Sequence, residues 1–316
     1  MSLLYSVMPE MVAEPLAWGE YKEAEEVYFF VCRFHEFSDG VPRVTAFPKL
    51  VAEFHRRSKP PGPAQSKTGK FGFDMITYGG RNPQDFPLCD TWEESFTRGL
   101  GKLFDLEAET HKGEEGGDDM QRLRKGIMDK VIPRLLRPLE TEGRTLTPTL
   151  VHGDLWDGNA SVDGTTGQSM FFDATPLWAH NESQLADELA PWWLLRHEMT
   201  DAYIEEYKRH YDPAEPSEDF ESRGALYALA IATMEDLLSK FPLGYEGYAS
   251  EKGLAAGADA ARVNAKAFEA NANISGGLVQ GSDVTTAAGP DSEKTDRIHG
   301  EEWHGAKKAD AAKVQL

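Results

Sequence analysis

The sequence predicts an α+β fold in which helices dominate and strands are few. An aromatic and β-branched run, VYFFVCRF at 27–34, is typical of a β-strand. Apolar residues recur at helical spacing in several segments, the longest of them at 120–139. Short apolar runs alternate with turn residues between 149 and 173, and this pattern predicts a β-hairpin.

The N-terminal part supplies the first strand, which we expect to be buried, and then two helices. Apolar residues at helical spacing predict a helix over 44–55, with Thr45 as a candidate N-cap and Pro48 in the first turn. The segment 58–72 is rich in proline and glycine, so it should be a surface loop. Helical periodicity resumes at Trp92.

The middle and C-terminal parts are mostly helical. The apolar stripe over 120–139 should be kinked by Pro133, because proline removes a helix hydrogen bond, and the helix should end near Glu140. Large apolar residues among charges at 185–211 and 217–241 are typical of packed helices.

Composition changes beyond residue 248, where alanine, glycine, serine and charged residues replace most bulky apolar ones. Such a segment buries too little apolar surface to offset its ordering entropy, so we expect at most one helix near 251–270 and a disordered tail. The sequence therefore predicts three parts: 1–37 with the first strands, 38–248 as the helical body, and 249–316 as the tail.

Charge and cysteine content limit the classes of function. The 316-residue chain has a formal net charge of −20, which argues against nucleic acid and anionic membranes as partners. The two cysteines, Cys32 and Cys89, are too few for a disulfide scaffold, although one bridge stays possible. The N-terminus has no basic region followed by an apolar run, so we expect a cytoplasmic protein.

The segment LVHGDLWDGN at 150–159 concentrates the polar groups that carry chemistry. A hairpin turn centred near Thr165 would place Phe171 opposite Asn159 and put Asn159 and Asp173 on one face. A carboxylate and a carboxamide suit Mg²⁺, which keeps several waters and binds phosphates with few protein groups. Asp154 could then orient a hydroxyl and accept its proton, as in phosphoryl transfer.

Two other interpretations of these residues exist. Short polar side chains such as Asp154, Asp157 and Asn159 commonly cap turns, although that role does not explain the aspartate that closes the return strand. His152, Asp154 and Asp173 could also form a hydrolytic metal site. Zinc hydrolases usually recruit more nitrogen ligands than this segment offers.

The segment resembles the catalytic loop of the fructosamine kinase (ketosamine kinase) family, which is related to the aminoglycoside phosphotransferases and has a protein-kinase-like fold. The resemblance covers roughly residues 5–245 and is strongest to the fungal form. Other stretches that agree in order include EPLAWG at 14–19, KLVAEFH at 49–55, VIPRLLRPLETEGR at 131–144 and FFDATPLWAHNE at 171–182.

The resemblance implies a role for each residue of the loop. Asp154 would be the catalytic aspartate, Asn159 and Asp173 the magnesium ligands, and His152 a brace for the loop. Trp156 would pack against the sugar of the substrate, and Glu182 would lie beside the substrate cleft, although an exposed pair of His180 and Glu182 without such a role is an alternative. Arg33 and Phe34 would stand at the hinge that contacts the adenine of ATP.

The family's activity supplies the expected reaction. Its members use ATP and Mg²⁺ to phosphorylate a sugar hydroxyl of ketosamines, free or bound to protein. The phosphate ester then decomposes and releases the amine, so the step repairs glycation. By this resemblance, residues 1–37 would be the remainder of the N-terminal lobe and the hinge, and 38–248 the catalytic lobe.

The sequence departs from the family's pattern in its nucleotide-binding part. The glycine-rich loop, the strand lysine and the helix glutamate of relatives are not visible, and Lys22, the one early lysine, lies in a charged turn. Arg33 stands where relatives carry a glutamate. The alternative function is therefore a catalytically impaired binding module that keeps the substrate cleft, because the missing lysine and loop normally stabilise the transferring phosphoryl group.

Overall fold

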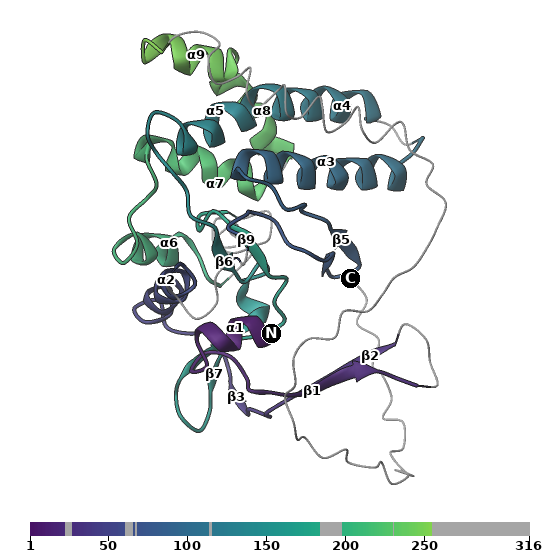
Figure 1. The fold of residues 1–316 in the computed structure, drawn as a ribbon, viewed down its shortest axis with the longest axis vertical. Coiled ribbons are helices and arrows are strands. Elements are labelled where there is room, and N and C mark those ends of the chain that lie inside the picture. The colour runs from purple at the N-terminus through teal and green to yellow at the C-terminus, as the bar shows by residue number, and fades with distance from the viewer. Residues whose placement is uncertain are drawn as a thin grey trace. The chain divides into compact units, whose positions relative to one another are not determined.

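Helices form most of the regular secondary structure in the described part of the chain, and the strands are short (Figure 1). The computed structural model describes residues 1–22, 27–60, 66, 68–113, 116–183, 198–229 and 231–254. These residues lie in one unit that spans Met1–Arg262. The expected tail beyond 254 and the first part of the helix expected over 185–211 lie outside the described residues.

The first element is a short helix that the sequence pattern did not predict, α1 (Ser2–Val7). Its buried residues Leu4 and Val7 pack in the same apolar cluster as Phe47 and Phe171. The N-terminal helix therefore shares a core with the helical body, and the boundary expected between residues 37 and 38 stays a prediction.

Strands β1 (Pro15–Glu20) and β2 (Tyr28–Cys32) form an antiparallel pair in which Trp18 lies opposite Phe30. The strand predicted within 27–34 is confirmed, but its expected burial is wrong. Trp18 is 65% exposed and Phe30 is 46% exposed. The reason is that the sheet has two strands and no other described element covers this face.

Helix α2 (Phe47–Arg57) confirms the helix predicted over 44–55. It buries Phe47, Val51 and Phe54 completely, and proline stands in its first turn, where a missing N–H costs nothing. The expected cap is wrong, because the N-cap position is Ala46 rather than Thr45, and no side chain accepts a capping hydrogen bond there.

The next elements are a small hairpin of β4 (Thr77–Gly79) and β5 (Asn82–Gln84) and the long helix α3 (Trp92–Thr110). Thr91 caps α3 by accepting a hydrogen bond from the backbone N–H of Glu94 at 3.2 Å. Trp92 and Phe96 are fully buried on the helix, as its periodicity predicted.

The stripe over 120–139 is one interrupted helical segment: α4 (Gly117–Gly126), a π turn (Ile127–Val131), α5 (Ile132–Leu136) and a 3₁₀ turn (Arg137–Glu140). The predicted interruption is confirmed and takes the form of the π turn, which ends at Val131, two residues before Pro133. Proline cannot donate to the carbonyl four residues earlier, so the turn widens there. The predicted end near Glu140 is also confirmed.

The remaining helices complete the α-rich body. They are α6 (Asp201–Lys208), a 3₁₀ turn (Ser217–Asp219), α7 (Phe220–Ala228), α8 (Ile231–Lys240) and α9 (Gly244–Glu251). Helices α3, α5 and α7 surround a second apolar cluster that includes Trp92, Leu135 and Tyr227. Figure 1 shows α3, α4, α5 and α7 gathered together in this part of the molecule. Among the described residues, none of the helices combines the length and the apolar character that crossing a membrane requires.

The strands that carry the functional segment lie in two small antiparallel sheets. Strand β6 (Thr149–Val151) pairs with β9 (Leu177–Ala179). In the other sheet, β7 (Ala160–Asp163) lies between β3 (Phe37–Ser38) and β8 (Ser169–Phe171). The hairpin predicted between 149 and 173 is confirmed as β7 and β8.

The expected register of this hairpin is wrong by one residue, because Phe171 pairs with Ala160 rather than with Asn159. The turn explains the shift. Asp163 Oδ1 accepts hydrogen bonds from the backbone N–H groups of Thr165 at 3.1 Å and Thr166 at 2.6 Å. Asp163 N–H then bonds to the carbonyl of Gln168 at 2.9 Å, so the loop is longer than a turn centred on Thr165 would be.

Candidate active site

The segment HGDLWDGN connects β6 to β7 as a tight loop. Gly153, with φ of 84°, turns the chain after His152 in a conformation that other residues rarely adopt. A 3₁₀ turn (Asp157–Asn159) closes the loop, and the Asn159 N–H donates to the Trp156 carbonyl at 2.9 Å. The loop thus returns the chain into the hairpin within a few residues.

His152 is fully buried and links the loop to the end of β8. Its Nδ1 accepts a hydrogen bond from the Asp154 N–H at 3.3 Å, and its Nε2–H donates to the Phe172 carbonyl at 2.9 Å. The edge of the Phe171 ring packs against the imidazole, with ring centres 5.0 Å apart. These contacts fix the imidazole between the loop and β8, and the role of His152 as a brace stays a prediction.

Asp154 and Asn159 lie side by side. The amide Nδ2 of Asn159 donates to the Asp154 carbonyl at 2.9 Å and to its carboxylate Oδ2 at 2.8 Å. Because both bonds use the amide nitrogen, the oxygen Oδ1 of Asn159 is directed away from Asp154. That oxygen is the atom with which a carboxamide binds a cation.

Asp173 follows β8 and has a φ of 57°, a left-handed conformation that aspartate tolerates better than most residues. Its neighbours fix its backbone beside the loop. The Phe172 N–H donates to the Asn159 carbonyl at 3.0 Å, and the Thr175 N–H donates to the His152 carbonyl at 2.9 Å. Asp173 itself is exposed. Backbone bonds therefore hold the residue next to the loop of Asp154 and Asn159.

The hydrolytic metal site considered from the sequence has no support here. Within the described residues, no three His, Cys, Asp or Glu side chains are grouped so that they could hold a metal ion. Both ring nitrogens of His152 already take part in hydrogen bonds, so neither is left for zinc.

Glu182 lies in the interior rather than on an exposed loop, so the alternative of an exposed His180–Glu182 pair is wrong. It is 2% exposed, and its carboxylate accepts hydrogen bonds from Arg223 Nε at 2.7 Å and from the Ala214 N–H at 2.7 Å. Burial raises the pKa of the Glu182 carboxyl, and the Arg223 guanidinium opposes that shift. The expected contact between Glu182 and the substrate stays a prediction, and the contacts observed are those of a buried ion pair.

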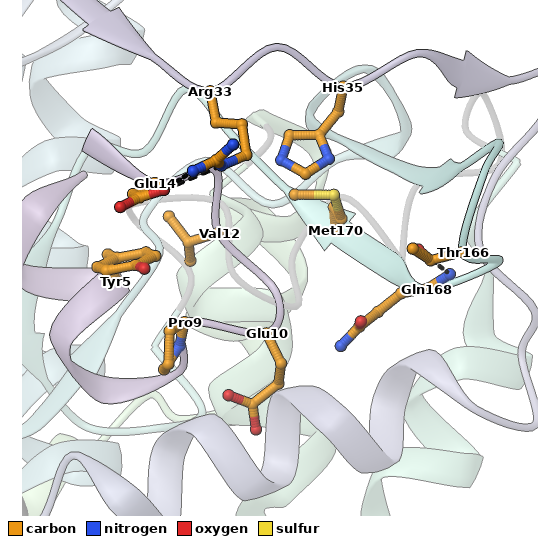
Figure 2. A pocket seen from close by; sticks show the side chains of 10 residues that line it. All are labelled: Tyr5, Pro9, Glu10, Val12, Glu14, Arg33, His35, Thr166, Gln168 and Met170. Atoms are coloured by element: carbon orange, nitrogen blue, oxygen red, sulfur yellow. Dashed lines mark hydrogen bonds and ion pairs between the residues drawn. The ribbon is translucent and has the colours of Figure 1, made fainter. Parts of the chain in front are cut away.

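Arg33 and Phe34 follow β2. The Nε–H of Arg33 donates to Glu14 Oε2 at 2.9 Å, and Phe34 is 87% exposed. Figure 2 shows Arg33 and Glu14 on the wall of a cavity of 190 Å³ that is also lined by Thr166, Gln168 and Met170. This cavity is beside the turn of the β7–β8 hairpin, whereas Asn159 is beside its other end. The contact of Arg33 and Phe34 with a nucleotide stays a prediction.

The segment after Arg33 is tied to the same hairpin, a feature that sequence reasoning missed. His35 Nδ1 and Asp163 Oδ2 are 2.7 Å apart, and the Gly164 N–H donates to the Glu36 carbonyl at 2.7 Å. The hydrogen bond with His35 holds the pKa of the Asp163 carboxyl well below its usual range. The sequence DGTTG at 163–167 signalled a turn but not the partner of its aspartate.

The helical body, the small sheets and the loop between β6 and β7 define an α+β protein-kinase-like fold. A solved structure titled a putative fructosamine-3-kinase, from Thermobifida fusca YX-ER1, shares this fold, with a TM-score of 0.50 and 18% identity over 76% of this chain and 75% of that one. The sequence model of one family, fructosamine kinase, matches residues 1–249. The chain belongs to the fructosamine kinase family, and the family recognised from the sequence is confirmed.

Curated relatives bear kinase names. A chloroplastic protein-ribulosamine 3-kinase of rice (Oryza sativa subsp. japonica) is 31% identical over 49% of this chain and 41% of its own length. A ketosamine-3-kinase of mouse (Mus musculus) is 31% identical over 37% of this chain and 34% of its own length. The chain thus spans less than half the length of these relatives.

Proposed function

We propose that this chain is an ATP-dependent kinase that phosphorylates a sugar hydroxyl of ketosamines, either small molecules or glycated proteins. The observation that carries the proposal is the bonded group of His152, Asp154 and Asn159 beside the backbone of Asp173. Membership of the fructosamine kinase family supports the kinase class, and the names of its relatives support the ketosamine substrate. We also expect the protein to act in the cytoplasm.

In the proposed reaction, the substrate hydroxyl attacks the γ-phosphorus of ATP. Asp154 orients that hydroxyl and accepts its proton, while the bond from the γ-phosphorus to the β–γ bridging oxygen breaks and ADP leaves. Asn159 holds the Asp154 carboxylate in place through Nδ2 at 2.8 Å. His152 fixes the backbone of the loop, because both of its ring nitrogens are hydrogen-bonded.

The residues also fit a magnesium ion. The oxygen Oδ1 of Asn159 and the exposed carboxylate of Asp173 are the two protein ligands that we propose, and so small a set suits Mg²⁺. A bound ion would neutralise charge on the phosphates of ATP. On the substrate side, we propose that Trp156 packs against the sugar.

The test is phosphate transfer from ATP to a ribulosamine or fructosamine, measured with Mg²⁺ for the wild-type chain and for Asp154→Asn. We expect a loss in kcat on the order of 100-fold to 10,000-fold for this variant, as for removal of a general base. The matched control is Asp157→Asn, the same change on the same loop. Asp157 accepts a hydrogen bond from the Glu198 N–H at 3.2 Å, and an asparagine oxygen can accept the same bond, so activity should persist.

Transfer that is equal in the wild type and Asp154→Asn would contradict the proposed mechanism. If the wild type binds a ketosamine but transfers no phosphate, the alternative of a catalytically impaired binding module is the better description.

A further inference from the structure

Gly158 lies under the indole ring of Trp156. A β-carbon built on Gly158 would lie 2.3 Å from Cη2, 2.4 Å from Cζ2 and 2.7 Å from Cζ3 of that ring. Side-chain atoms do not approach so closely, so any larger residue would displace the indole. Trp156 is the N-cap residue of the 3₁₀ turn (Asp157–Asn159), and Gly158 is its middle residue.

The backbone does not explain the glycine. Gly158 is absent from the residues with positive φ, in contrast to Gly153 at 84°. Alanine could therefore adopt the same backbone conformation without strain. Gly158 is also exposed, so the bulk of the core does not exclude a side chain. The contact with Trp156 is the constraint that remains.

We infer that Gly158 is a positioning residue for Trp156: its bare α-carbon lets the indole lie across the 3₁₀ turn and keeps part of the ring open to a ligand. Trp156 is 39% exposed, so the ring is partly covered by its own loop and partly accessible. An exposed aromatic surface of this kind packs well against the C–H groups of a sugar. This inference rests on the proposed function, because the substrate contact of Trp156 belongs to that proposal.

The inference predicts which kinetic constant changes. In Gly158→Ala the indole must rotate away from the turn, while Asp154 keeps its bonds to His152 and Asn159. We expect the KM for the ketosamine to rise about tenfold, with kcat and the KM for ATP changed less than about threefold, the pattern for lost substrate binding. The control is Gly101→Ala on α3, where the added carbon would meet the Met128 methyl at an ordinary 3.5 Å.

A second variant separates displacement of the ring from general damage to the loop. Trp156→Ala removes the clash, so Gly158→Ala should have almost no added effect in that background, a non-additivity that marks direct coupling. If Gly158→Ala alone folds poorly, the double variant should recover the fold. Equal effects of Gly158→Ala with and without Trp156 would overturn the inference.

The position of the ring can be followed without any activity. The protein labelled with 5-fluorotryptophan should give ¹⁹F resonances from its seven tryptophans, and the Trp156 resonance is the one absent from Trp156→Phe. In Gly158→Ala that resonance should shift while the others stay in place. A Trp156 resonance that is unchanged in Gly158→Ala would overturn the inference. If that resonance shifts in the variant but the wild type transfers no phosphate, only the proposed function is overturned.

Discussion

Two of the antiparallel strand pairs, β1 with β2 and β7 with β8, have opposite environments. In the pair of β1 and β2, most side chains are exposed, including Trp18 and Phe30. In the pair of β7 and β8, nearly all positions are buried, and Phe171 is 1% exposed. Strand-favouring residues are concentrated in β2, which belongs to the exposed pair, whereas β7 and β8 contain one each, so local preference did not decide burial.

The difference comes from neighbours that are distant in sequence. Phe171 contacts the rings of Phe54 on α2 and His152 on the loop, and its N–H donates to the Met11 carbonyl at 3.0 Å. No described element provides such contacts for the exposed face of β1 and β2. Accordingly, the buried pair should be sensitive to substitution and the exposed pair tolerant.

The largest expected effect is on core packing. Phe171→Ala should lower the free energy of unfolding by about 4 kcal/mol, because it removes a buried ring and leaves a cavity. Phe30→Ala is the matched change on β2 and should lower it by less than about 1 kcal/mol. Denaturant unfolding of both variants checks the comparison, and similar losses would show that the exposed pair is covered in solution.

Ion pairs show the same contrast between the interior of the helical body and the exposed strands β1 and β2. Arg223 is fully buried against Glu182, so Arg223→Met should lower the free energy of unfolding by about 3 kcal/mol by leaving a buried carboxylate without its partner. Arg33 pairs with Glu14 at the base of the exposed strands, and Arg33→Met should leave the unfolding midpoint almost unchanged. A midpoint that falls as far for Arg33→Met as for Arg223→Met would contradict this contrast.

A further effect should appear as a dependence of stability on pH. Glu140 accepts a hydrogen bond from the Trp92 N–H at 2.8 Å at the start of α3, and burial raises the pKa of its carboxyl to about 7. The folded chain therefore keeps a proton that the unfolded chain loses near pH 4.5. Stability from this group is complete below pH 4.5 and declines by about 3 kcal/mol as the pH rises to 7.

Unfolding of the wild type and Glu140→Gln at pH 5 and pH 8 measures this effect. The neutral amide cannot ionise, so the free energy of unfolding of Glu140→Gln should not decline between these two pH values. The control Glu20→Gln, on exposed β1, should show the same decline as the wild type. An identical pH dependence in the wild type and Glu140→Gln would show that the carboxyl does not keep its proton in the folded protein.

The sequence predicted the elements that have strong local signals. The strand near 28–32, the helix near 47–57, the interruption before Pro133 and the hairpin all follow from periodicity or from proline and turn chemistry. The helix Ser2–Val7 was missed because six residues are too few to show a period. The burial of β2 and the hairpin register were wrong because distant neighbours and the side chain of Asp163 decide them.

The polar residues of the candidate loop stood out in the sequence, but most of their contacts did not. The hairpin pattern predicted Asn159 and Asp173 on one face, with Asp154 on the loop before them. The structure shows Asn159 bonded to Asp154, and the pairing of Asn159 with Asp173 as ligands stays a prediction. The partners of His35 and Glu182 were not predictable, because Asp163 and Arg223 are far away in the sequence. The contact between Gly158 and Trp156 could be read only once the fold of the loop was known.

The left-handed backbone of Asp173 affects how that position should be mutated. Substitution by alanine would remove the carboxylate and also place at this position a residue for which left-handed torsion angles are unfavourable. A loss of activity could then come from the missing carboxylate or from a displaced backbone. Asparagine removes the charge and tolerates the same torsion angles, which makes Asp173→Asn the informative probe. Library design should admit only asparagine, glycine and aspartate at this codon.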